Sequence, residues 1–304
     1  TVMADAVRDF LVAKKSADTL RVFVNTFLAE TWEDQGETVG DIDFADRAEE
    51  WSNEIDDRIV VVTAGIDVQD DRLELEIVGW GRDEESWSLD YKTLYGDPST
   101  PHLWNDLDNI LKAGYVTESG RQLGIRAATI DSGGHYTQAV YNFVRPREGR
   151  RIFAIKGMGG EQRPLVSRPT KNNIGKIKLF AVGTFPIKEL IFSRLKVQSE
   201  GAGFCHFPAG RSDEYYQQLA NSEKIVTKYQ KGFPRRDFVK TRTRNEALDC
   251  RVYAYAALCI LSLNINAVAD RVVNAPEPEA PPQPQQSNPL ARRPRQGGFV
   301  NSWR

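Results

Sequence analysis

Three aspartates stand at positions where a folded chain could bring their carboxylates together. Asp67 follows the largely apolar residues 60–66, and Asp131 follows a second such run and precedes Ser132-Gly133-Gly134. Asp249 lies near the start of a predicted helix whose later turns carry small or apolar side chains. Carboxylates grouped in this way bind hard divalent cations such as Mg²⁺ or Mn²⁺ through oxygen. Two such ions about 3.5–4 Å apart would stabilise the attacking and the leaving oxygen in phosphodiester hydrolysis.

Each acid also has a purely structural interpretation. Taken alone, Asp67 is as consistent with a residue that caps a loop as with a residue of a ligand site. The sequence Asp-Ser-Gly-Gly alone is a common turn. Asp249 and Glu246, which share one side of the helix start, would complement the helix dipole. The hypothesis of a shared site therefore depends on Asp67 and Asp131 ending neighbouring strands. In that case their carboxylates lie within a few ångströms, and their repulsion calls for a cation between them.

The elements that position these acids follow from the hydrophobic pattern. Residues 59–66, 73–80 and 87–94 predict three strands joined by short polar turns, which favours an antiparallel meander. The second of these strands alternates, with Glu74 and Glu76 on its more polar face. Further along the chain, helices and strands alternate, which indicates parallel pairing through right-handed crossovers. The predicted helices cover residues 102–111, 137–144, 186–195, 213–220 and 245–263, the predicted strands cover residues 125–130, 152–155, 179–182 and 204–207, and a hairpin covers residues 224–240.

This order of elements predicts a ribonuclease H-like α/β fold. Its mixed sheet combines an antiparallel meander with parallel strands and is flanked by helices, and it occupies residues 58–265. Residues 1–57 form a separate predicted region, with two helices in residues 1–35 and an acidic linker that has a short helix around residues 44–51. Residues 266–304 are predicted to be a flexible tail, rich in proline and basic at its end, because such a composition buries too little apolar surface to fold.

The charge balance limits how the chain could bind an anionic partner. It has 40 Lys and Arg against 42 Asp and Glu, a net charge of −2, so nucleic acid would have to be held by local patches. Residues 224–244 form such a patch, with eight basic residues and one acid. A basic β-ribbon suits contacts to a DNA backbone, although a solvated strand face is the plainer interpretation. The candidate DNA contacts are Lys156, Lys188, Lys228, Lys231, Arg235, Arg236, Lys240, Arg242 and Arg244.

The cysteines and the apolar stretches indicate the redox compartment of the protein and its relation to membranes. Three cysteines without a CxxC pair exclude a disulfide scaffold and favour a reducing compartment. The longest apolar stretch falls well short of the roughly 20 residues that cross a bilayer, so no membrane contact is predicted. The chain begins at Thr1, and we therefore expect a fragment or a processed product.

Several segments resemble the C-terminal half of lambda-type phage terminase large subunits. The resemblance runs through residues 24–32, 63–67, 79–81, 131–134, 155–157 and 244–250, and its most specific piece is Asn245-Glu246-Ala247-Leu248-Asp249-Cys250. It implies a metal-dependent endonuclease that cuts concatemeric phage DNA during genome packaging in the host cytoplasm. It also implies that Asp67, Asp131 and Asp249 hold two Mg²⁺ or Mn²⁺ ions and carry catalysis. Glu246 and His135 are second-tier candidates.

The same resemblance implies a set of partners. These are double-stranded DNA, a small terminase subunit that chooses the site, the portal of the procapsid through the C-terminal tail, and an ATPase motor domain upstream. The chain has no GxxxxGK[ST] sequence, so the motor is expected in the missing part of a longer protein, with residues 1–57 as its trailing edge and linker. Two alternatives remain: a resolvase- or transposase-type nuclease of the same fold, and a non-catalytic docking module for portal or small subunit.

Overall fold

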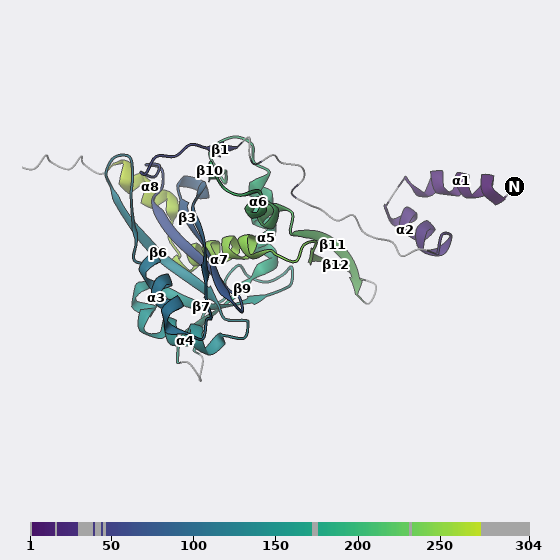
Figure 1. The fold of residues 1–304 in the computed structure, drawn as a ribbon. Coiled ribbons are helices and arrows are strands. Elements are labelled where there is room, and N and C mark those ends of the chain that lie inside the picture. Colours follow the sequence, from purple (N-terminus) through teal and green to yellow (C-terminus); the bar gives the residue numbers. More distant parts are fainter. Residues whose placement is uncertain are drawn as a thin grey trace, which may run out of the picture.

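A computed structural model describes residues 2–15, 17–29, 39, 44, 47–171, 176–230 and 233–274 (Figure 1). At the start of the chain, helices α1 (Val2–Ala13) and α2 (Ala17–Thr26) confirm the two predicted helices. They pack against each other through Phe10 and Phe23, whose ring centroids lie 5.8 Å apart.

The short helix expected around residues 44–51 is wrong where the structure describes this segment. Ala48 and Glu49 form strand β1 (Ala48–Glu49) instead. This strand adds in parallel to strand β10 (Cys205–Pro208), with Ala48 opposite Phe207. An open sheet edge offers backbone hydrogen bonds that override a weak local preference for helix.

The predicted antiparallel meander is confirmed. Strands β2 (Val61–Val68), β3 (Arg72–Trp80) and β4 (Ser86–Tyr95) follow one another, with the short 3-10 helix η1 (Arg82–Glu84) before β4. Strand β2 is buried along almost its whole length, as its β-branched and apolar sequence predicts.

The remaining elements complete a mixed sheet. The next ones in chain order are α3 (Pro101–Ile110), β5 (Gly114–Val116), β6 (Gln122–Asp131), α4 (Thr137–Val144), η2 (Arg145–Arg150), β7 (Ile152–Met158), β8 (Thr170–Lys171), β9 (Lys178–Gly183) and α5 (Thr184–Leu195). After β10 follow α6 (Asp213–Ala220), the hairpin strands β11 (Glu223–Gln230) and β12 (Phe233–Lys240), α7 (Glu246–Leu261) and α8 (Ile265–Val273). The sheet runs β1-β10-β4-β3-β2-β6-β7-β9-β8, with β5 paired to β6, while β11 and β12 form a ribbon of their own.

The order and directions of these strands define the ribonuclease H-like arrangement. Strands β2, β6, β7 and β9 are parallel neighbours, and the antiparallel meander lies on the other side of β2. Each face of the sheet has its own core. Helices α5, α6 and α7 cover one face, with side chains such as Ile191, Leu219 and Val252, and α3 and α4 cover the other, with Leu107 and Val144 (Figure 1).

Two features of the sheet and its end differ from expectation. Glu74 and Glu76 lie on a buried face of the sheet, and neither has any exposed surface. Their charges are neutralised there by one arginine on α7 and one on the segment just before that helix. Beyond residue 265, where the tail was expected to begin, the chain forms α8, which buries Ile265 and Ala269 against the core. Residues 275–304 lie outside the described part of the chain.

In the described ranges, no single helix has both the length and the apolarity to cross a membrane. The pair α7 and α8 reaches that length and composition jointly, but it is bent by 78° between the two helices.

Candidate metal centre

Strands β2 and β6 bring two of the three candidate aspartates to one edge of the sheet. The strands pair in parallel, with Gly65 opposite Thr129 and Ile66 opposite Ile130. The next residues are Asp67 and Asp131, which therefore leave neighbouring strands at the same end. This confirms the expected strand adjacency, and it follows the rule that sites in open α/β sheets form at the carboxyl ends of strands.

Helix α7 reaches the same place because it packs directly on these two strands. Gly65 has no side chain to separate them, and a Cβ atom there would lie 2.0 Å from the carbonyl oxygen of Cys250. Two threonines on the strands form hydrogen bonds to the backbone of the helix. The Thr63 hydroxyl donates to the carbonyl of Ala254 at 2.8 Å, and the Thr129 hydroxyl donates to that of Tyr253 at 2.7 Å. These contacts hold the first turn of α7, with Asp249, over the end of β2 and β6.

A cavity of about 500 Å³ opens at this end of the sheet. Asp67 and Asp131 line it, together with Lys156 from the end of β7 and His135 from the loop after β6. Its wall is mostly polar side chains and glycine backbone, which suits a charged ligand better than an apolar one.

The acids in this cavity repel one another. Burial raises the pKa of Asp67 to about 7, and the charges of Asp249, Asp131 and Glu246 add to this effect, against a hydrogen bond from Gln69. Burial, and then Asp249, also raises the pKa of Asp131, although the backbone N–H of Gly133 donates to its carboxylate at 3.1 Å. Burial and repulsion destabilise the charged form of these carboxylates, and a bound cation would stabilise it. The carboxylate oxygens of this cavity therefore fit a hard divalent ion.

Asp249 already has two partners inside the protein. One of its oxygens lies 2.8 Å from the ammonium of Lys188, and the other accepts a hydrogen bond of 2.7 Å from the Asn245 amide. Lys188 also contacts Glu223 at 2.7 Å, and Asn245 donates to the same glutamate at 2.9 Å. Burial lowers the pKa of Lys188, but the two carboxylates outweigh it and raise the pKa above its ordinary value.

This network corrects the expectation that Lys188 contacts DNA. Only 7% of the residue is exposed, so it is not free to reach a phosphate on the surface. A lysine beside two carboxylates on a buried helix face is stabilised by those charges, and its place here is to hold Asp249 in position.

Asp67, Asp131 and Asp249 do not all lie within 4.8 Å of one another. In the described part of the chain, one trio of potential ligand side chains has atoms all within 4.8 Å of one another, and it is Glu85, Glu200 and His206. At least one pair among Asp67, Asp131 and Asp249 is therefore farther apart than that. The trio that does meet the limit is occupied by the guanidinium of Arg58, which contacts both of its glutamates.

Glu246 and His135 occupy different surroundings. Glu246 is buried and paired with Arg72 at 2.8 Å and with Arg244 at 3.3 Å, and both arginines also contact Glu74. Its charge is thus neutralised by its neighbours. His135 is exposed at the cavity, with its Nδ1 atom 3.0 Å from a carboxylate oxygen of Asp70.

The basic hairpin is confirmed as a β-ribbon, but several of its cations are paired. Lys228 contacts Asp237 at 3.0 Å, Arg236 contacts Glu189 at 2.6 Å, and Arg242 contacts Glu214 at 2.8 Å. Lys240 donates to the side-chain oxygen of Asn245 at 2.7 Å, which links the ribbon to the start of α7. Arg235 is exposed on β12, and Lys231 lies outside the described residues.

Sequence reasoning missed the polar residues that hold the aspartates. Gln69 donates to Asp67, and Asn245 and Glu223 complete the Asp249 network. Gln69 follows Asp67 by only two residues, so this contact could have been predicted from the sequence. Glu223 is separated from Lys188 by 35 positions, and no local pattern pairs them.

The amino-acid sequence matches a known family. A family model described as the endonuclease domain of the terminase large subunit gpA matches residues 1–270. The chain therefore belongs to that family, which confirms the resemblance found in the sequence. The matched stretch includes Asp67, Asp131 and Asp249.

Two curated relatives support the assignment. The chain is 34% identical over 267 residues to the terminase large subunit of Escherichia phage lambda, which covers 86% of the chain and 42% of that relative. It is 32% identical over 267 residues to the terminase large subunit of Enterobacteria phage P21, which covers 85% of the chain and 41% of that relative. The chain thus spans less than half the length of the relatives it matches.

Two solved structures show weaker likeness. One is the nuclease domain of the large terminase g2p of bacteriophage SPP1 with bound Mn, at 10% identity and a TM-score of 0.33, covering 64% of this chain and 85% of that one. The other is a mutant nuclease domain of the large terminase subunit gp2 of bacterial virus Sf6 with manganese, at 11% identity and a TM-score of 0.39, covering 69% of this chain and 92% of that one. Likeness at this level adds nothing to the family assignment.

Proposed function

We propose that this chain is a metal-dependent endonuclease that cuts concatemeric phage DNA during genome packaging. Membership of the terminase endonuclease family supports the reaction class. The observation that carries the proposal within this chain is the cavity lined by Asp67 and Asp131, which leave adjacent parallel strands, with Asp249 close enough for its charge to raise the pKa of both. The raised pKa values of Asp67 and Asp131 point to a site that favours a bound cation.

Asp67, Asp131 and Asp249 would hold Mg²⁺ or Mn²⁺ in this proposal. When bound, two such ions supply activation of a water nucleophile and charge stabilisation at the leaving oxygen. Lys188 and Asn245 are positioning residues, because they fix the carboxylate of Asp249 through its two oxygens.

The DNA backbone would approach over the exposed cations around this cavity. Lys156 lies at the cavity itself and is exposed. The β11–β12 ribbon leads into the first turn of α7, so its lysines and arginines lie on the chain segment next to Asp249. These contacts are to phosphates, which position a duplex without reading its sequence. His135 is proposed as a further contact at the cavity mouth.

The wider setting is proposed from the family as well. The full-length protein would carry an ATPase motor before this domain, act in the host cytoplasm, and take its cutting site from a small terminase subunit. The tail beyond residue 274 would dock on the portal of the procapsid. Deleting residues 275–304 would then abolish portal binding while leaving cleavage of free DNA intact.

Nicking of supercoiled plasmid DNA tests the central proposal. Asp67→Asn, Asp131→Asn and Asp249→Asn should each lower Mn²⁺-dependent nicking by on the order of 100-fold or more. Asp106→Asn on helix α3, a half-exposed aspartate that contacts His102 and does not line the cavity, is the matched control and should nick like the wild type. Unchanged nicking in the Asp67→Asn variant would exclude the proposed site.

The same variants discriminate between the proposal and its alternatives. Titration calorimetry should show Mn²⁺ binding that is lost in Asp67→Asn, whereas a docking module would show no such dependence. A resolvase-type enzyme would cut branched DNA in preference to linear duplex. Family membership favours the terminase reaction over this alternative.

A further inference from the structure

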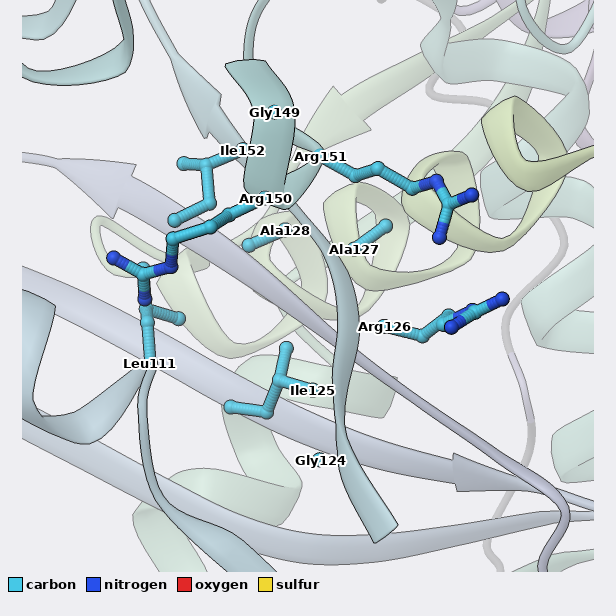
Figure 2. Close-up of a pocket in the computed structure, with 10 residues that line it drawn as sticks. All are labelled: Leu111, Gly124, Ile125, Arg126, Ala127, Ala128, Gly149, Arg150, Arg151 and Ile152. Atoms are coloured by element: carbon cyan, nitrogen blue, oxygen red, sulfur yellow. The ribbon is translucent and has the colours of Figure 1, made fainter. Parts of the chain in front are cut away.

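A second cavity lies at the opposite end of strand β6 from Asp131. It has a volume of about 310 Å³ and is lined by residues 124–128 of β6, by residues 149–152 around the start of β7, and by Leu111 after α3 (Figure 2). Three arginines line it, namely Arg126, Arg150 and Arg151. Arg126 precedes Asp131 by five residues, which is about 17 Å along a strand, so this cavity is separate from the candidate metal centre.

Arg126 enters the cavity through an irregularity in its strand. Val62 of β2 pairs with Ile125, whereas the next residue, Thr63, pairs with Ala127. Arg126 is therefore the extra residue of a bulge between β2 and β6. Bulges turn a side chain away from the regular alternation of the strand, and they are found next to functional sites.

Arg151 lies at a second irregularity, between η2 and the start of the neighbouring strand β7. It has φ 58° and ψ 39°, which is the left-handed region that favours glycine, yet an arginine stands there. Its carbonyl accepts a hydrogen bond of 3.0 Å from the backbone N–H of Ala128, so the two irregular positions lie on paired segments. Backbone conformations of this kind persist where the surrounding structure imposes them, and they gather at ligand sites.

The two irregularities direct their arginines to one side of the strands. In Figure 2 the side chains of Arg126 and Arg151 extend to the same side, whereas Arg150 extends to the other. There Arg150 contacts Asp108 at 2.6 Å, so its charge is neutralised. In the described part of the chain, neither the Arg126 nor the Arg151 guanidinium has a hydrogen bond or an ion pair.

The surroundings of these guanidinium groups are strongly basic. Arg151 also lines an adjoining cavity of about 460 Å³, whose other charged residues are Arg168 and Lys178. Among the described residues that line the two cavities there is no aspartate or glutamate. Apart from Arg150, which Asp108 neutralises, four cations line the two cavities, and one carboxylate lies beside them, that of Glu148, which accepts a hydrogen bond of 2.8 Å from the backbone N–H of Lys178. A local excess of this size attracts anions.

We propose that Arg126 and Arg151 form a phosphate-binding site. The guanidinium group presents a planar fork of N–H donors that matches two oxygens of a phosphate. Gly124 and Gly149 border the cavity, and a Cβ atom on either would meet no heavy atom within 4 Å, so the approach is open. The phosphate reaches this site either as free phosphate or as part of a DNA backbone, and only the second source rests on the proposed function.

The test compares Arg126→Gln/Arg151→Gln with the wild type. The matched control is Arg271→Gln, which changes an exposed arginine on α8 at a distant part of the surface. Titration calorimetry with inorganic phosphate should show saturable binding in the wild type and the control, and at least a tenfold weaker affinity in the double variant. Thermal unfolding of the three proteins in phosphate-free buffer should coincide, since both substituted side chains are exposed.

A second arm identifies the source of the phosphate. Binding of a 20-base-pair duplex is measured in EDTA, so that nothing is cut, over a range of salt concentrations. A site that takes DNA loses about one to two units of the slope of log K against log salt in the double variant, because each phosphate contact contributes about 0.9. Loss of inorganic phosphate binding with unchanged DNA binding assigns the site to free phosphate.

Two further outcomes separate this inference from the proposed function. If the wild type binds phosphate through the two arginines but binds no duplex, the site stands and the nuclease proposal fails. If the double variant binds both phosphate and duplex like the wild type, or the wild type binds no phosphate, the arginine site is refuted, while cleavage at the aspartates is unaffected.

Discussion

Gly65 of strand β2 lies in direct contact with the backbone of helix α7 at Cys250. A Cβ atom on Gly65 would lie 2.0 Å from the carbonyl oxygen of Cys250 and 2.3 Å from the backbone nitrogen of Ala254. Asp67 follows Gly65 by two residues and Asp249 directly precedes Cys250. The contact therefore sets how closely the helix-borne aspartate approaches the strand-borne one.

We predict that Gly65→Ala separates α7 from β2. The obstacle is rigid backbone, so the added methyl group cannot be accommodated by a side-chain rotation. The free energy of unfolding should fall by about 3 kcal/mol, and the affinity for Mn²⁺ should fall at least tenfold. Urea denaturation and titration calorimetry measure the two effects.

The control for this change is Gly124→Ala in strand β6. A Cβ atom there meets no heavy atom within 4 Å, so stability should change by less than about 1 kcal/mol. A Gly65→Ala variant with wild-type stability and Mn²⁺ affinity would show that the helix can shift without disturbing the site.

Lys188→Met should destabilise the protein because it leaves Asp249 and Glu223 without their shared cation. Lys188 is 7% exposed and lies within 2.8 Å of both carboxylates. Removing one partner of a buried ion pair costs about 3–5 kcal/mol. Adding Glu223→Gln should recover part of that loss, because one uncompensated charge is removed.

Lys112→Met provides the comparison for Lys188. Lys112 contacts Asp108 at 2.7 Å, but its side chain is 58% exposed, so its loss should cost less than about 1 kcal/mol. Equal costs for the two lysines in urea denaturation would contradict the view that the Asp249 network is shielded from solvent.

The stability of the metal-free protein should decrease as pH rises from about 4 to about 7. The pKa of Asp67 is about 7 in the folded protein and near 3.8 in the unfolded chain, so between these values only the folded state holds the proton. Deprotonation at higher pH therefore costs up to about 4 kcal/mol of stability. The comparison is urea denaturation in EDTA at pH 5 and pH 8.

Asp67→Asn isolates the contribution of this one group. The variant lacks the titrating carboxyl, so it should lose less stability than the wild type between pH 5 and pH 8. In the wild type, Mn²⁺ affinity should rise as pH approaches 7, because the ligand must be deprotonated. An identical pH dependence of stability in the two proteins would place the titration elsewhere.

Arg251→Met should destabilise the protein because it removes the cation that pairs with the buried Glu76 on β3. The Arg251 guanidinium contacts Glu76 at 2.7 Å, and neither residue has more than 3% of its surface exposed. We expect a loss of about 3–5 kcal/mol in urea denaturation, since Glu76 is left charged and buried. The double variant Arg251→Met/Glu76→Gln should be more stable than the single one, and a simple sum of the two losses would exclude coupling between them.

Much of the fold could be predicted from the sequence because the pattern of each element is local. The apolar run before Asp67 identifies a buried strand, and the alternation of elements after residue 102 predicts parallel pairing with it. Helices α4 and α6 lie at the residues predicted for them. The short strands β5 and β8 and the helix α8 were missed, since two or three residues carry no period and α8 follows directly on a longer helix.

Hydrophobic burial fixes where strands and helices lie along the chain, so the carboxylates that end the central strands could be predicted from residue order alone. What those charges contact depends on how distant segments are brought together by folding. Glu76 and Arg251 are 175 positions apart, and Arg72 and Glu246 are 174 apart, so no spacing rule joins them. The same limit explains why Glu74 and Glu76 were expected on a polar face and Lys188 on the surface. Burial of a charge is settled by its partner, and the partner is supplied by a distant part of the chain that only folding brings near.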